Sequence, residues 1–470
     1  MFTTFLSRLL ILSGVLLTST PCSATASDQQ QKIPVIHIAA KNLSPLDIGL
    51  SIGQQSKQLF PDIEHRYDTY LATVFSQMRF DDLLRAQLPR LQNAINSTYK
   101  KELEGVASSW SLVHTNILGD GHLSWDEYWL LNVLPDIGIP VNGTGFGVLS
   151  GISTEQGAII GHNLDLLSTP ELRSLQAITV YNYGNKAVVN IGFAGVLSVL
   201  SGFNESGLYV ACLNAAPETA YQNPFTLHTR NTPPENVIQP KGFVLRQILE
   251  NATSTRQASR LVAKSSNGLS QNTLIADKQD IQVVEYSPGE QVVIRHWDSP
   301  TRPNKQWDRA LQIAVVDCLV TKQMPDNCQQ SKEGYRWGRL RSLAVFNKFK
   351  KAGTQDIARI MLDRKNQYYE ILAENTLQSM IYLPGSGHLY LYAASAADSS
   401  MPASYQVYYQ DIMSNEMRGR RNRTRFFWWL TAGLALLALA LWLIRRSMKR
   451  KDQTIVHRRG AIERTEAGLH

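Results

Sequence analysis

The feature that most constrains the fold is the stretch between residues 143 and 214, where apolar residues recur with a period of two. Short apolar runs in this stretch are separated by Gly, Asn and Asp, which favour turns. A side-chain period of two is typical of β-strands. The stretch therefore predicts an antiparallel meander. Its apolar runs include residues 158–160, 177–180, 188–191 and 208–210.

Helical patterns flank this meander. Residues 48–131 carry apolar side chains at helical spacing, and residues 243–264 repeat the pattern after the meander. Here several helices occur together, then several strands, then helices and strands again. Such separate blocks are typical of α+β layers and not of a doubly wound parallel sheet. Later segments fit the same scheme: strands at 33–39, 272–276 and 282–286, helices at 333–350 and 355–363, and a closing hairpin across 380–392.

Both ends of the chain carry signals for membranes. Residues 1–26 have Arg8, then an apolar run, then Ala24-Thr25-Ala26, which is the pattern of a secretory signal peptide with its cleavage site. Residues 426–444 contain no charged side chain, and nineteen helical residues are long enough to cross roughly 30 Å of hydrocarbon. We therefore expect a domain at 27–403 outside the cytosol, a basic tether at 404–425, one transmembrane helix, and a cytoplasmic tail at 445–470.

The charge distribution argues against nucleic acid as a partner. The formal net charge is +8, but residues 416–470 alone contribute thirteen Lys or Arg against four Asp or Glu. Arg8 adds one more positive charge. Subtracting this +1 and the +9 of residues 416–470 from the total of +8 leaves residues 27–415 slightly acidic, with a net charge of −2. A nucleic-acid-binding domain needs a basic face, and the composition of this part supplies none.

The cysteines predict one disulfide and no metal site. Cys318 and Cys328 lie ten residues apart in a polar segment, a spacing that suits a disulfide in an exported protein. Cys212 lies in an apolar strand-like run and is expected to be a buried thiol. The sequence has no Cys-x-x-Cys pair and no His-Glu-x-x-His motif, so it gives no support for a metal or another cofactor.

Five short motifs in a fixed order carry a family resemblance. They are Asn-Gly-Thr-Gly-Phe-Gly-Val at 142–148, Gly-His-Asn-Leu-Asp at 161–165, Gly-Phe-Ala-Gly-Val-Leu at 192–197, Ser-Gly-Phe-Asn-Glu-Ser-Gly-Leu at 201–208 and Cys-Leu-Asn-Ala at 212–215. This succession resembles the acyl-coenzyme A:6-aminopenicillanic-acid acyltransferase family of N-terminal-nucleophile hydrolases, distant relatives of bile-salt hydrolases and acid ceramidase. The resemblance covers about residues 33–395.

The resemblance implies a four-layer αββα sandwich and a precursor that cuts itself just before its nucleophile. The freed α-amino group then acts as the base in acyl transfer from an amide. The family motif has Cys where an ungapped alignment places Gly143, and glycine cannot attack a carbonyl. A shift of one residue makes Thr144 the nucleophile, with the scissile bond after Gly143.

The other site residues are implied by the same motifs. Asp165 matches the acid that orients the nucleophile and its amine, while Asn214 and Asn272 match positions that contact the oxyanion or the amine. His162 takes the place of an arginine. The substrate contacts expected on this basis are His162, Phe146 and Asn163.

The sequence leaves two functions open. In the first, the protein is a membrane-anchored amidohydrolase or acyltransferase for an acylated small molecule, peptide or lipid, and the anchor favours a lipid-like substrate. In the second, it is a catalytically inactive relative that keeps the pocket for binding, because Gly143 and His162 depart from the family pattern.

Overall fold

The computed structural model describes residues 33–215, 238–328, 332–365, 370–395, 402–407, 431 and 433–443. Within these residues, eight strands form one sheet and six strands form a second. The first sheet has the order β1 (Val35–Ile38), β4 (Gln176–Asn182), β5 (Ala187–Phe193), β6 (Ser201–Asn204), β7 (Tyr209–Asn214), β8 (Gln271–Ala276), β9 (Ile281–Tyr286) and β10 (Val293–Arg295). The second has the order β11 (Gln312–Val316), β2 (Asn142–Val148), β3 (Ile159–Asp165), β12 (Thr376–Leu383), β13 (His388–Ala394) and β14 (Pro402–Val407).

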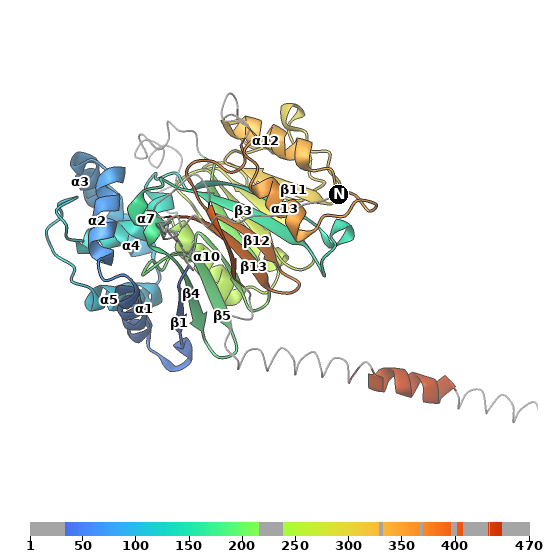
Figure 1. Ribbon diagram of the computed structural model, residues 1–470, viewed down its shortest axis with the longest axis horizontal. Helices are drawn as coiled ribbons and strands as arrows, with labels where there is room; N and C mark the ends of the chain where they lie inside the picture. The colour runs from blue at the N-terminus through green and yellow to red at the C-terminus, as the bar shows by residue number, and fades with distance from the viewer. Residues whose placement is uncertain are drawn as a thin grey trace, which may run out of the picture.

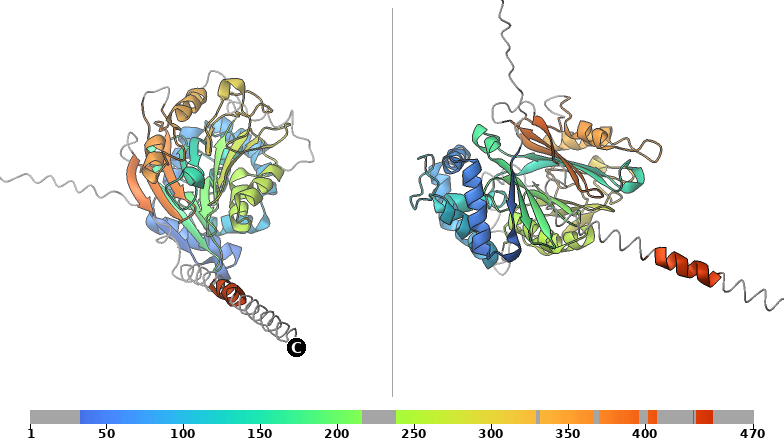
Figure 2. Two further views of the ribbon diagram at one scale, coloured as in Figure 1. Left: turned by 90° about the vertical axis from the view of Figure 1, so that its right-hand side faces the viewer. Right: turned by 60° about the horizontal axis from the view of Figure 1, so that its bottom comes forward.

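The two sheets lie face to face, with helices on both outer sides (Figures 1 and 2). The first sheet is covered by α10 (Lys241–Asn251) and α11 (Thr255–Lys264). The second is covered by α12 (Lys332–Leu343) and α13 (Thr354–Met361). This arrangement confirms the predicted α+β architecture of four αββα layers.

A helical lobe lies beside the β1 edge of the sandwich (Figure 1). It confirms the helical pattern predicted for residues 48–131. Ser44 caps the first helix, and Ser124 with Glu127 forms a capping box at the last. A buried ion pair of 2.6 Å joins Glu102 of the lobe to Arg246 of α10. The lobe comprises α1 (Pro45–Leu59), α2 (Ile63–Val74), α3 (Gln77–Ala86), α4 (Leu88–Ala94), α5 (Ser97–Ser109) and α6 (Trp125–Leu131). The short α7 (Pro170–Ser174) contacts α2.

The hairpin of β2 and β3 carries most of the candidate site. Its register pairs Asn142 with Asp165, Thr144 with Asn163 and Gly145 with His162. Because successive side chains of a strand point to opposite faces, Thr144 and Gly145 face different layers. Position 145 faces the other sheet, since a Cβ atom there would lie 2.8 Å from Leu274 of β8.

The chain ends are described only in part. The signal peptide predicted at 1–26 and the tail predicted at 445–470 lie outside the described residues, and so do most of the tether and part of the apolar segment 426–444. Residues 433–443 are helical and exposed. No helix within the described residues has both the length and the apolar character needed to cross a bilayer. The last described strand ends at Val407, four residues beyond the expected domain boundary.

Candidate functional site

The inner face of the β2–β3 hairpin, toward the eight-stranded first sheet, has no room for a side chain at position 143. A Cβ atom on Gly143 would lie 2.1 Å from the backbone oxygen of Asn163 and 3.3 Å from Nε2 of His162. Contacts under 3.0 Å do not occur for real Cβ atoms unless the neighbour shifts, and here the neighbour is backbone in a paired strand. The position that the family alignment gives to the nucleophile is therefore closed by the strand pairing itself.

His162 is a neutral side chain on this inner face. It is fully buried, and burial lowers its pKa to about 3. Its Nδ1 atom lies 3.1 Å from the Tyr209 hydroxyl and 3.3 Å from the Ser201 hydroxyl. Among the described residues Nε2 has no hydrogen-bond partner, and it points toward Gly143. The expected arginine position thus holds an uncharged group that fills the space next to position 143.

Thr144 lies on the outer face of the hairpin, toward α12 and α13. It is fully buried, and its hydroxyl has no hydrogen-bond partner within the part of the chain that the structure describes. Its cross-strand neighbour Asn163 donates through Nδ2 to the backbone oxygens of Met361 (2.8 Å) and Ile371 (3.0 Å). Phe146, on the same face, packs into an apolar cluster with Trp307 and Phe346. Asn163 and Phe146 were expected to contact the substrate. In the structure their side chains contact other residues of the protein interior.

A charged cluster lies on the outer face at the start of β2. Asp165 forms an ion pair of 2.8 Å with Arg336 of α12 and accepts a hydrogen bond of 2.5 Å from the Thr376 hydroxyl. Arg336 also lies 3.5 Å from Asp317. Asp317 in turn accepts a 2.6 Å hydrogen bond from the backbone N–H of Gly143. The acid expected beside the nucleophile is thus held by a cation, with a second carboxylate bound to the residue before Thr144.

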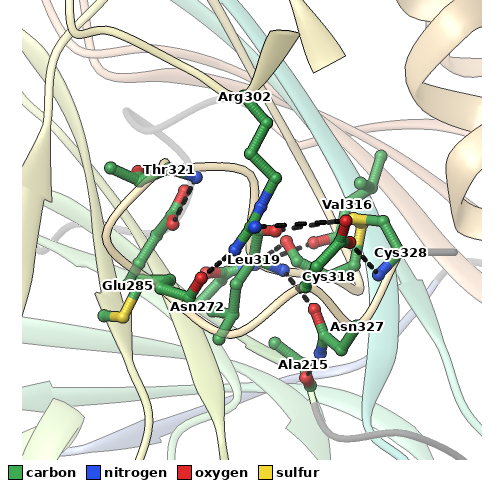
Figure 3. Close-up of a disulfide and its surroundings, with 12 residues drawn as sticks. Ala215, Asn272, Glu285, Arg302, Val316, Cys318, Leu319, Thr321, Asn327 and Cys328 are labelled. Atoms are coloured by element: carbon green, nitrogen blue, oxygen red, sulfur yellow. Dashed lines mark hydrogen bonds and ion pairs between the residues drawn. A yellow bond between two sulfur atoms is a disulfide. The ribbon is translucent and has the colours of Figure 1, made fainter. Parts of the chain in front are cut away.

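Asn214 and Asn272 lie on neighbouring strands, but their amide groups are engaged elsewhere. Asn272 donates through Nδ2 to the backbone oxygens of Val316 (2.8 Å) and Cys318 (2.9 Å), as Figure 3 shows. Asn214 donates through Nδ2 to the backbone oxygen of Ile139 at 3.4 Å. In this conformation both N–H donors of the Asn272 amide bind backbone carbonyls and are not free for an oxyanion, whereas Asn214 uses one of its two donors, in a long bond of 3.4 Å.

The disulfide between Cys318 and Cys328 confirms the pairing predicted from their spacing. It closes a loop directly after β11, next to the carbonyls that Asn272 binds (Figure 3). Within this loop the backbone N–H of Leu319 donates to the Asn327 side chain at 2.8 Å. Cys212 is a buried free thiol, as expected. The disulfide therefore fixes the segment that carries Asp317 beside Gly143.

The sequence-predicted residues fall into separate groups. Gly143 and His162 share the inner face, and Asn272 reaches across from the other sheet to β11. Thr144, Asn163 and Asp165 share the outer face. Three residues of this site were not predicted from the sequence: Arg336, Asp317 and Thr376. No local motif marks these three, although Asp317 directly precedes a disulfide cysteine. Among the described residues, no group of three His, Cys, Asp or Glu side chains is placed to hold a metal ion.

Comparison with solved structures gives low similarity scores. A Caenorhabditis elegans N-acylethanolamine-hydrolyzing acid amidase ortholog is 16% identical, with 52% of this chain and 93% of that chain covered and a TM-score of 0.37. A mutant conjugated bile acid hydrolase from Clostridium perfringens is 14% identical, with coverages of 56% and 92% and a TM-score of 0.35. Penicillin V acylase from Agrobacterium tumefaciens is 12% identical, with coverages of 58% and 88% and a TM-score of 0.32. No curated protein matches the chain.

The family comparison is more informative. Residues 152–398 match the family model described as acyl-coenzyme A:6-aminopenicillanic acid acyl-transferase. The match covers more than half of the 470 residues and includes Asp165, Asn214 and Asn272. It begins after Thr144, so it does not test the nucleophile position. The match confirms the resemblance seen in the sequence: the chain belongs to the acyl-coenzyme A:6-aminopenicillanic acid acyltransferase family of N-terminal-nucleophile hydrolases.

Proposed function

We propose that this protein is an exported, membrane-anchored member of the family that is not cut after residue 143 and that binds an acylated molecule without hydrolysing it. The observation that carries the proposal is the closed position at Gly143. A nucleophile on the inner face would need a side chain where a Cβ atom meets backbone oxygen at 2.1 Å. Neutral His162 occupies the adjacent space.

The outer face does not supply an accessible nucleophile in place of the one that is missing on the inner face. Thr144 is buried beneath the helices that cover its sheet, and Asn272 of the facing sheet gives both of its amide donors to backbone carbonyls. Acyl transfer needs a nucleophile that can reach the substrate, and donors aimed at the developing oxyanion. This chain keeps the scaffold of the site, with Asp165 and Arg336 still paired, but not the geometry that the reaction requires.

The ligand class follows from the family, whose description names an acyl donor. Export rests on residues 1–26 and anchoring on the uncharged run 426–444. With this orientation the domain lies outside the cytosol and the basic tail inside. A tethered domain meets membrane-borne molecules at a raised effective concentration, so we assign an acylated lipid or envelope-associated amide in preference to a freely diffusing one.

A second candidate is acyl transfer by Thr144. It is favoured by two observations: the Thr144 hydroxyl is buried without a partner in the described parts of the chain, and Asp165 lies on the same face of the hairpin. Buried hydroxyls in native proteins are usually hydrogen-bonded, so an unpartnered one can mark a reactive group. In this mechanism Thr144 attacks after self-cleavage, its free amine is the base, and Asp165 orients that amine.

The two candidates are separated by a binding and turnover experiment on the mature full-length protein in detergent. N-acyl amines of increasing chain length are added, and both thermal stabilisation and amine release are followed. The proposal predicts stabilisation that grows with acyl length and no released amine. Amine release by the wild-type protein that is lost in Thr144→Val would establish the second candidate and reject the first.

A further inference from the structure

The loop between α12 and α13 presents an unusual combination of side chains to solvent. Phe349 is 89% exposed and Val345 is 48% exposed. Lys348, Lys350 and Lys351 lie beside them on the same exposed loop, and none of the three has a carboxylate partner within the part of the chain that the structure describes. Single exposed apolar residues are common, but an exposed Phe surrounded by lysines has the composition of a membrane-interface contact.

This loop is held in place at both ends. The side chain of Asn347 accepts hydrogen bonds from the backbone N–H groups of Phe349 (2.9 Å) and Lys350 (3.0 Å). On the N-terminal side, Phe346 packs into the apolar cluster beneath α12. On the C-terminal side, the backbone N–H of Ala352 donates to Ile152 at 2.9 Å. Phe349 is therefore presented outward by a fixed turn, which lowers the entropy lost on binding.

The loop lies at the end of the sandwich from which the chain continues toward the apolar segment. The last described strand, β14, ends with Val407 paired with Leu389, at the start of β13. The turn before β13 contacts residue 156, because a Cβ atom on Gly385 would lie 1.9 Å from the Gln156 oxygen. Two residues earlier, the backbone N–H of Thr154 donates to Ala352 at 2.9 Å. These contacts connect the exit point of the chain to the base of the Phe349 loop.

We propose that this loop docks on an anionic lipid surface, with Phe349 and Val345 at the level of the acyl-chain boundary and Lys348, Lys350 and Lys351 on the headgroups. The inference rests on the proposed membrane anchor, which brings this end of the domain to the bilayer. An aromatic ring is stable at the interface, while ammonium groups are attracted by anionic lipids and lysine stems reach past the ring. Docking would fix the orientation of the domain relative to the membrane.

The test uses the mature full-length chain reconstituted in vesicles. Phe349→Cys is labelled with an environment-sensitive fluorophore; the native cysteines do not compete, because Cys212 is buried and Cys318 is bonded to Cys328. Met78→Cys, at a 75% exposed apolar position on α3 in the helical lobe, is the matched control. Vesicles contain phosphatidylcholine alone or with phosphatidylglycerol, and spin-labelled lipids serve as quenchers.

We expect lipid quenching at position 349 only in the anionic vesicles and none at position 78. Replacing Lys348, Lys350 and Lys351 by Gln should lower the docked-to-free ratio by about fivefold per lysine. Equal exposure of both labels to aqueous quencher would overturn the proposal. Protection at position 349 in detergent that grows with protein concentration would assign the loop to a second copy and also overturn it. Extraction of the chain by alkaline carbonate reports separately on the anchor.

Discussion

The two faces of the β2–β3 hairpin differ in what they offer a reaction. The inner face carries Gly143 and a neutral His162, and leaves no room for a side chain at position 143. The outer face carries Thr144 and the Asp165–Arg336 ion pair. Because a strand has a period of two, moving the nucleophile by one residue moves it to the opposite face. A threonine next to the missing cysteine therefore does not occupy the cysteine's place.

The largest effect should come from restoring a thiol on the inner face. Gly143→Cys is expected to lower the free energy of unfolding by about 4 kcal/mol, because the new Cβ overlaps backbone that strand pairing prevents from moving. Gly338→Cys on α12 is the matched control, since a Cβ there meets nothing within 4 Å. Urea denaturation measures both. A stable Gly143→Cys protein that hydrolyses amides would show that the inner face can open.

Breaking the ion pair on the outer face should have the next largest effect. Asp165→Asn is expected to cost about 3 kcal/mol, because it removes the carboxylate charge that lies 2.8 Å from the buried Arg336 guanidinium. Arg339 lies on the same helix as Arg336 and forms a more exposed ion pair with Asp363. Arg339→Gln should therefore cost about 1 kcal/mol or less. Denaturation at pH 7 compares the two. Equal costs would mean that the buried cluster contributes nothing specific.

The free energy of unfolding should depend on pH because of His162 on the inner face. The folded-state pKa of His162, about 3, is below its unfolded value, so protons bind the unfolded chain more tightly. The stabilisation is complete above pH 6.5 and is lost as the pH falls toward 3. Between pH 7 and 5 we expect a loss of about 2 kcal/mol in the wild type that is absent in His162→Gln. Parallel pH profiles for the two proteins would place a charge on His162.

The smallest effect is expected for Thr144→Val. This change removes a buried hydroxyl without a partner and keeps the side-chain shape, so stability should stay within about 1 kcal/mol of the wild type or rise. Thr273→Val, another buried hydroxyl without a partner, should behave alike. Calorimetry of both variants makes the comparison. A loss of several kcal/mol at position 144 alone would indicate that its hydroxyl has an important role on the outer face.

Much of the fold followed from sequence, because hydrophobic period and turn residues are local properties. The helical lobe, the Cys318–Cys328 bond and the strands of residues 143–214 were predicted in this way, but the single meander was wrong in part, because β2 and β3 join the second sheet and only β4 to β7 run as a meander in the first. The site was predicted only in part. Which face Thr144 occupies depends on the pairing of β2 with β3 and on which layer covers each side. Arg336 is 171 residues away from Asp165 in the chain, and no spacing rule connects them.

The most direct test of the account is the mass of the mature protein under denaturing conditions. An uncut chain beginning near residue 27 gives one mass for residues 27–470, and we expect this single species even after long incubation. Cleavage after Gly143 gives two pieces of 117 and 327 residues, the larger one beginning with Thr144. Finding those two pieces in the wild type and a single chain in Thr144→Val would contradict the account.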